Sequence, residues 1–116
     1  MEILKYIKKN YNYIVIFTNL DNDPTGSIKE NMCLENNGYT CCWVIANSRK
    51  IEKILLYIRE NNINKIYQAD YNYRENIEGR RYKVYYNNLE FVDNTKFHWK
   101  EFTNTQSPIR YINKII

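Results

Sequence analysis

The sequence predicts a small α/β (or α+β) domain with a βαβαβ core, followed by an antiparallel hairpin and a short helix. Two continuous apolar runs, at 13–17 and 41–46, are typical of strands that are covered on both faces. Strands that alternate with helices predict parallel pairing through right-handed crossovers. The clearest helical pattern lies at 51–58, where the apolar side chains at helical spacing are Ile51, Ile54, Leu55 and Ile58.

Two further helices are predicted in the first part of the chain. Residues 2–9 have apolar side chains on one helical face and lysines on the other. The loop 19–26 is rich in Asn and Asp, and Ser27 with Glu30 then has the form of a capping box, which begins a helix. Gly38 is a typical residue at which such a helix ends.

The later elements are predicted to be shorter. Ser48 is a candidate N-cap of the helix at 51–58, and Asn61 with Asn62 would end that helix. The remaining elements are a third core strand at 65–69, a hairpin of 80–86 with 89–91 around a turn at Asn87–Asn88, a short helix at 96–102 and a final strand after Pro108.

Length and composition favour one globular domain over residues 1–116. The chain is 44% apolar and 26% charged, with a formal net charge of +4, which excludes a disordered chain. No apolar run approaches about 18 residues and no signal peptide is visible, so we expect a cytoplasmic protein with no membrane partner. The surplus of Asn, Ile, Lys and Tyr indicates A+T-rich coding. Such small chains are common in phages and mobile elements, where an accessory or anti-defence role is the expectation.

The cysteines and the histidine give no site by themselves. Cys33, Cys41 and Cys42 are odd in number, and two of them are adjacent, so we expect buried reduced thiols in a reducing compartment. His98 is the only histidine and stands between two aromatic residues, which favours a packing or surface role. No catalytic constellation is recognisable, so we expect a binding protein rather than an enzyme, without a cofactor.

The second half of the chain interleaves cations with aromatic residues, and this pattern predicts the main candidate site. Arg and Lys neutralise phosphates, and aromatic faces stack on unpaired bases. We therefore expect an exposed surface for a nucleic acid or a nucleic-acid-handling protein, although the same residue types are enriched where proteins associate, including in homodimers. The candidate residues are Arg74, Arg80, Arg81, Lys83, Tyr85, Lys96, Trp99, Lys100 and Arg110.

An alternative site would lie at the carboxyl ends of the predicted parallel strands. Asp21, Asp23, Ser48 and Asp70 would converge there and could hold Mg²⁺ together with a nucleotide or other phosphate, as in a small α/β enzyme. The structural alternative is that these residues cap helices and form turns, as Asp and Ser commonly do in loops. No phosphate-binding loop or dinucleotide fingerprint supports the enzymatic interpretation.

Overall fold

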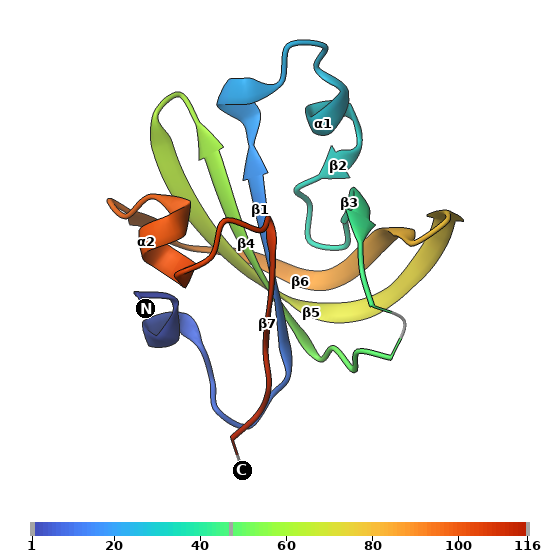
Figure 1. The fold of residues 1–116 in the computed structure, drawn as a ribbon, viewed down its shortest axis with the longest axis vertical. Coiled ribbons are helices and arrows are strands. Elements are labelled where there is room, and N and C mark those ends of the chain that lie inside the picture. The colour runs from blue at the N-terminus through green and yellow to red at the C-terminus, as the bar shows by residue number, and fades with distance from the viewer. Residues whose placement is uncertain (1, 47, 116) are drawn as a thin grey trace.

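One mixed sheet of seven strands organises the protein (Figure 1). The computed structural model describes residues 2–46 and 48–115. The strand order is β2-β3-β6-β5-β4-β1-β7, with β1 and β4 parallel and all other neighbours antiparallel. The strands are β1 (Tyr13–Asn19), β2 (Met32–Cys33), β3 (Tyr39–Val44), β4 (Lys53–Glu60), β5 (Ile63–Glu78), β6 (Arg81–Thr95) and β7 (Ile109–Ile112). The helical segments are η1 (Glu2–Tyr6), η2 (Leu20–Asn22), α1 (Ser27–Glu30) and α2 (Trp99–Thr103).

The central pair β1 and β4 is buried on both faces. Ile14 and Ile54 face one core cluster, whereas Val15 and Leu55, the next residues along each strand, face the other. This alternation follows from the strand geometry, in which successive side chains point to opposite faces. Burial on both faces explains the continuous apolar run of β1 and the unbroken series of apolar residues at 54–58 in β4.

Different elements close the two clusters. On one face, η1 and α2 pack side by side and bury Ile3, Trp99 and Phe102 against the sheet (Figure 1). On the other face, Ile45 and Ile51 from the β3–β4 segment contribute to the cluster together with apolar residues of β6. The core therefore lies on both sides of β1 and β4.

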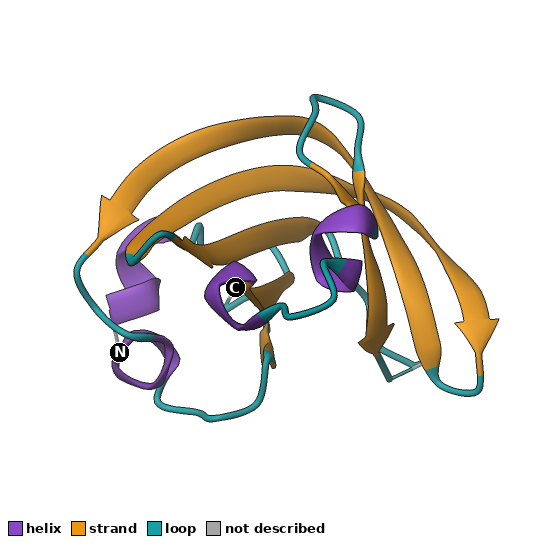
Figure 2. Ribbon diagram, turned by 90° about the horizontal axis from the view of Figure 1, so that it is seen from above, coloured by secondary structure: helices purple, strands orange, loops and turns teal. Residues whose placement is uncertain are grey.

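The long hairpin of β5 and β6 bends the sheet into an arch (Figure 2). Its strands have 16 and 15 residues, and their pairing shifts register at four points. Each extra residue bends the strand that carries it and increases the local twist. Because of this curvature, the tip of the hairpin points away from η1 and α2 (Figure 2).

The predicted helix at 51–58 is wrong, because residues Lys53–Glu60 form strand β4. Leu56 and Tyr57 are buried beside the residues of the predicted helical stripe, so the segment is apolar on both sides and fits a central strand. The predicted helix after Ser27 extends only to Glu30. With mostly sheet and few helices, the fold fits the broad α/β or α+β class but has no helix at the second predicted crossover.

The turns also differ from the predicted ones. Asn61 and Asn62 join β4 to β5 with φ values of 55° and 61°, so they form a tight hairpin turn and do not end a helix. Asn87 and Asn88 lie inside β6, and the tip of the long hairpin is at 79–80. Gly38 does not end a helix. A glycine is needed there because a Cβ at this position would lie 1.9 Å from the main-chain oxygen of Cys33.

Several other expectations agree with the structure. The opening helix, the strand at 13–17, the strand in the region 41–46, the short helix before residue 104 and the final strand are all present with shifted bounds. The reduced state expected for Cys41 and Cys42 is wrong, since these two half-buried residues form a disulfide in β3, and Cys33 is the free cysteine. Within the described part of the chain, no helix has the length and apolar character needed to cross a membrane.

Candidate functional site

Three neighbouring strands bring three tyrosines and a lysine together on one face of the sheet. Tyr85 of β6 lies opposite Tyr39 of β3 on one side and opposite Tyr73 of β5 on the other. Lys83 lies two residues before Tyr85 on the same strand and so points to the same face. We call Tyr39, Tyr73, Lys83 and Tyr85 the tyrosine–lysine surface.

The rings of this surface are packed in an ordered way. Tyr73 and Tyr85 stack with their ring centroids 4.4 Å apart and their planes 10° from parallel. The Lys83 ammonium lies 4.0 Å from the ring centroid of Tyr39 and 5.1 Å from that of Tyr85, within the range of cation–π attraction. Tyr73 remains 50% exposed, so part of its ring is open to a ligand.

Three cations and two acids lie on or next to this surface. Lys83 lies opposite Glu75 and Arg81 lies opposite Glu78, while Arg80 is exposed in the turn between the strands. Hydrogen bonding with Tyr85 raises the pKa of Lys83, so its ammonium stays protonated. The Arg81 guanidinium donates a hydrogen bond of 3.0 Å to the main-chain oxygen of Cys42 on the neighbouring strand β3.

Two residues predicted for this surface lie elsewhere because of the alternation of the strand and the packing of the core. Arg74 lies opposite the buried Val84, on the other face of the hairpin, and donates to the main-chain oxygen of Arg49 at 3.2 Å. Trp99 is only 6% exposed, and its indole N–H donates to the main-chain oxygen of Ser107 at 2.7 Å. The prediction of Trp99 as an exposed contact is therefore wrong.

Three other predicted cations, Lys96, Lys100 and Arg110, lie in parts of the fold far from the tyrosine–lysine surface. Lys96 is exposed directly after the last residue of β6, and Lys100 is exposed within α2. Ten strand positions separate Tyr85 from Thr95, a path of about 33 Å. Arg110 lies on β7, the edge strand on the other side of the sheet, and its buried Nε has no hydrogen-bond partner among residues 2–46 and 48–115. The nine predicted residues thus do not form one patch.

Asp21 and Asp23 of the alternative site hold main-chain groups. The two Asp21 oxygens accept hydrogen bonds from the main-chain N–H groups of Asn61 and Asn62, at 2.7 and 3.0 Å. The two Asp23 oxygens accept from the N–H groups at the start of α1, at 3.2 and 3.1 Å. Asp23 thereby provides the cap that the sequence assigned to Ser27. Both carboxylates act as the structural alternative describes.

Ser48 and Asp70 do not join these two aspartates. Ser48 is exposed in the segment before β4, and Asp70 lies opposite Lys53, the first residue of β4. Asp21 binds the turn after the last residue of β4, about eight strand positions or 26 Å away. The loops do not converge, because β4 is a strand and Asp70 lies within the long β5. Asn47, in the same loop as Ser48, lies outside the described residues.

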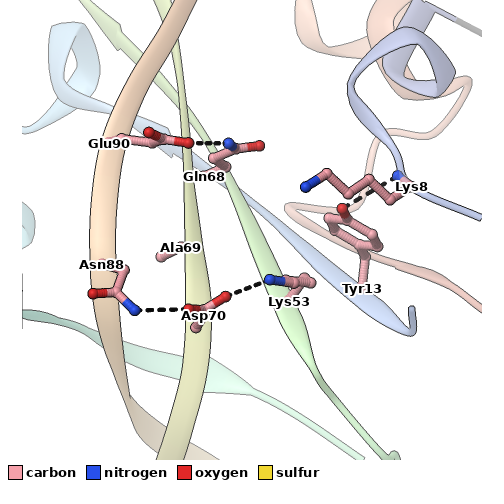
Figure 3. A pocket seen from close by; sticks show the side chains of 8 residues that line it. All are labelled: Lys8, Tyr13, Lys53, Gln68, Ala69, Asp70, Asn88 and Glu90. Atoms are coloured by element: carbon pink, nitrogen blue, oxygen red, sulfur yellow. Dashed lines mark hydrogen bonds and ion pairs between the residues drawn. The ribbon is translucent and has the colours of Figure 1, made fainter. Parts of the chain in front are cut away.

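Asp70 instead lies in a small polar pocket of about 210 Å³ on the face that η1 and α2 partly cover (Figure 3). It accepts hydrogen bonds from the Lys53 ammonium and, at 2.8 Å, from the Asn88 amide. The bond from Lys53, followed by that from Asn88, lowers the pKa of Asp70 below its usual range. The pocket is lined by Lys8, Tyr13, Lys53, Gln68, Ala69, Asp70, Asn88 and Glu90.

The sequence alone did not single out Tyr39 of the tyrosine–lysine surface or, apart from Asp70, the residues that line the polar pocket. Tyr39 is distant in sequence from the hairpin and reaches it only because β3 pairs with β6. Lys53 was assigned to a helix, so its pairing with Asp70 could not be foreseen. An alternating pattern in β5, with Gln68 and Asp70 on one face, is the signal that could have indicated a polar sheet face.

Comparisons with known proteins and metal-site geometry add no assignment. Residues 2–46 and 48–115 contain no group of three or more His, Cys, Asp or Glu side chains that could hold a metal ion. No protein-family model, curated protein or solved structure matches this chain.

Proposed function

We propose that this protein is a non-enzymatic binding protein that holds single-stranded nucleic acid on the tyrosine–lysine surface. The observation that carries the proposal is the stacked pair of Tyr73 and Tyr85 with the Lys83 ammonium beside it. A base that stacks on the open part of Tyr73 would extend this pair. Stacking of this kind tolerates any base and contributes about 1–3 kcal/mol for each base.

The neighbouring charges set the expected strength of binding. Lys83, Arg80 and Arg81 would neutralise phosphates along the strand, whereas Glu75 and Glu78 weaken the local positive potential. If three phosphates are neutralised, the logarithm of the affinity should fall with the logarithm of salt concentration with a slope of about −2. We therefore expect modest affinity with a weak dependence on base sequence.

The alternative of a phosphate site around Asp21 and Asp23 has less support. Their carboxylate oxygens already accept main-chain hydrogen bonds, and Asp70 lies at the other end of the sheet. A partner protein that itself handles nucleic acid would use the same rings and cations. Capture of such a partner is therefore one outcome of the experiment.

The experiment measures fluorescence anisotropy of a labelled oligothymidylate against the wild-type protein and matched variants. Tyr73→Ala should weaken binding roughly 5- to 150-fold, since it removes about 1–3 kcal/mol of stacking, and Tyr73→Phe should retain most of it. Arg81→Glu with Lys83→Glu should reduce affinity strongly while the unfolding free energy changes little.

The control is the double variant Lys96→Glu with Lys100→Glu, which makes the same charge change away from the surface. Loss of binding in this control, with the surface variants unaffected, would contradict the proposal. Absence of any oligonucleotide binding, together with capture of a protein that the Tyr73→Ala variant does not capture, would assign the surface to a protein partner.

A further inference from the structure

We propose that the polar pocket beside η1 binds a small zwitterion of the α-amino acid class. The pocket lies between the η1–β1 segment on one side and strands β5 and β6 on the other (Figure 3). It encloses about 210 Å³, the volume of roughly seven water molecules at about 30 Å³ each. A small amino acid fits that space.

The floor of the pocket is held rigid by side chains that bind one another. The Lys53 ammonium binds Asp70, and the other Asp70 oxygen accepts from Asn88. The same ammonium lies 4.7 Å from the ring centroid of Tyr11. These contacts use the charges of Lys53 and Asp70 within the protein, so neither residue needs a ligand.

Two opposite charges on the walls remain available. The Lys8 side chain is exposed and has no hydrogen-bond or ion-pair partner among the described residues, and Figure 3 shows it directed across the pocket toward Gln68. Glu90, on the far wall, binds the Gln68 amide through one carboxylate oxygen. Its second oxygen makes no hydrogen bond within the described part of the chain.

This arrangement selects the chemistry of the ligand. A carboxylate would bind the Lys8 ammonium, and an ammonium group would bind the free oxygen of Glu90, each through a charge-assisted hydrogen bond. A simple anion or a simple cation could bind only one wall, and it would be repelled by a charge of its own sign on the other wall. A zwitterion therefore fits the pair of walls better than either ion.

The test measures the melting temperature of the full chain with glycine, alanine, serine or glutamine, and in parallel with acetate or methylammonium. A ligand that binds only the folded state raises the melting temperature. We expect at least one amino acid to do so and the two simple ions to have much smaller effects at the same concentration. Calorimetric titration then gives the affinity of the strongest amino acid.

Matched variants locate the site. Lys8→Met and Glu90→Gln should each weaken amino acid binding about tenfold or more, because each removes one charged partner. Lys9→Met, a change at the neighbouring exposed lysine that does not line the pocket, should leave the affinity unchanged. All three changes lie at exposed positions, so circular dichroism should report intact folding.

Two results would overturn the inference. Equal stabilisation by acetate and by the amino acids would indicate a plain anion site, and no stabilisation by any of the four amino acids would show that the pocket holds only solvent. Oligonucleotide binding to the tyrosine–lysine surface is measured separately, so failure here is distinguishable from failure of the proposed function.

Discussion

The structural roles of Asp21, Asp23 and Asp70 differ with the hydrogen-bond donors that surround each carboxylate. Asp21 and Asp23 accept main-chain N–H groups and thereby fix a turn and the start of α1. Asp70 accepts from two side chains, Lys53 and Asn88, which come from the neighbouring strands. The first role stabilises local backbone, whereas the second joins three strands on a polar part of the sheet.

Asp70 should make stability depend on pH in acid. Its folded-state pKa lies below the usual 3.8, so the folded protein binds this proton less readily than the unfolded chain. The contribution is therefore full well above pH 3.8 and is lost as the pH falls below that value through the folded-state pKa. Asp70→Asn should lower the unfolding free energy at neutral pH, and the difference from wild type should shrink in acid.

Urea unfolding at a series of pH values measures this effect. The control is the same substitution in a Lys53→Met background, where the main partner of Asp70 is already absent and the effect should be smaller. A difference between wild type and Asp70→Asn that stays constant from neutral pH into acid would contradict this role for the ion pair.

Some of these residue roles could be predicted from sequence and others could not. Capping of α1 could be predicted only in part, because Asp and Ser both commonly accept main-chain N–H groups at the start of a helix and the capping-box pattern pointed to Ser27 and not to Asp23. Asp70 and Lys53 are 17 positions apart, so their pairing requires knowledge that β4 is a strand. Tyr39 likewise needs the β3–β6 register before its place beside Tyr85 can be known.

Among the elements, β4 shows why an apolar pattern can match two structures. Ile51, Ile54, Leu55 and Ile58 have helical spacing, but the intervening Leu56 and Tyr57 are also buried. A strand places these two residues on opposite faces, each against a core cluster, whereas a helix would leave them on its polar side. Burial on both faces is a property of the whole sheet and is not visible in the segment alone.

The β4–β5 turn depends on asparagine because both turn residues have positive φ. Asn62→Gly should preserve the turn, since glycine adopts this conformation without steric cost. Asn62→Val should destabilise the protein by about 1–2 kcal/mol relative to the glycine variant, because a β-branched residue strains at positive φ. Chemical denaturation measures the difference.

Both Asn62 variants lose the same amide, which accepts a hydrogen bond from Arg59, so the comparison isolates the backbone. Equal stability of the glycine and valine variants would show that the turn does not hold Asn62 in the left-handed region.

For the whole molecule, the long hairpin determines both the shape and the available edges. Residues 72–78 of β5 extend past Lys53, the first residue of β4, and have no described strand on one side. The same is true of residues 90–94 of β6. Three of the four register shifts fall inside these stretches, at Asn72, Ile77 and Val92. Irregular backbone of this kind hinders the pairing of an open edge with another chain.

We therefore expect the protein to be a monomer of 14.2 kDa in solution despite its open strand edges. Multi-angle light scattering over a range of protein concentrations measures the mass directly. A mass that doubles as the concentration rises would contradict this expectation and would favour a homodimer formed through one of the edges.

The overall site was only partly predictable for a related reason. Alternation at 80–86 correctly places Lys83 and Tyr85 on one face of a strand. The arch and the strand order then separate them from Lys96, Lys100 and Arg110, which follow later in the sequence. Their proximity in the sequence predicted a single patch, but the strand order places these residues on separate parts of the molecule.

The most direct test of the central claim is a nuclear magnetic resonance titration of the labelled protein with oligothymidylate. We predict that the largest chemical-shift changes occur at Tyr39, Tyr73, Lys83 and Tyr85, with small changes around α2. Changes centred on Lys96 and Lys100, or no changes at oligonucleotide concentrations that saturate the anisotropy signal, would contradict the assignment of nucleic-acid binding to the tyrosine–lysine surface.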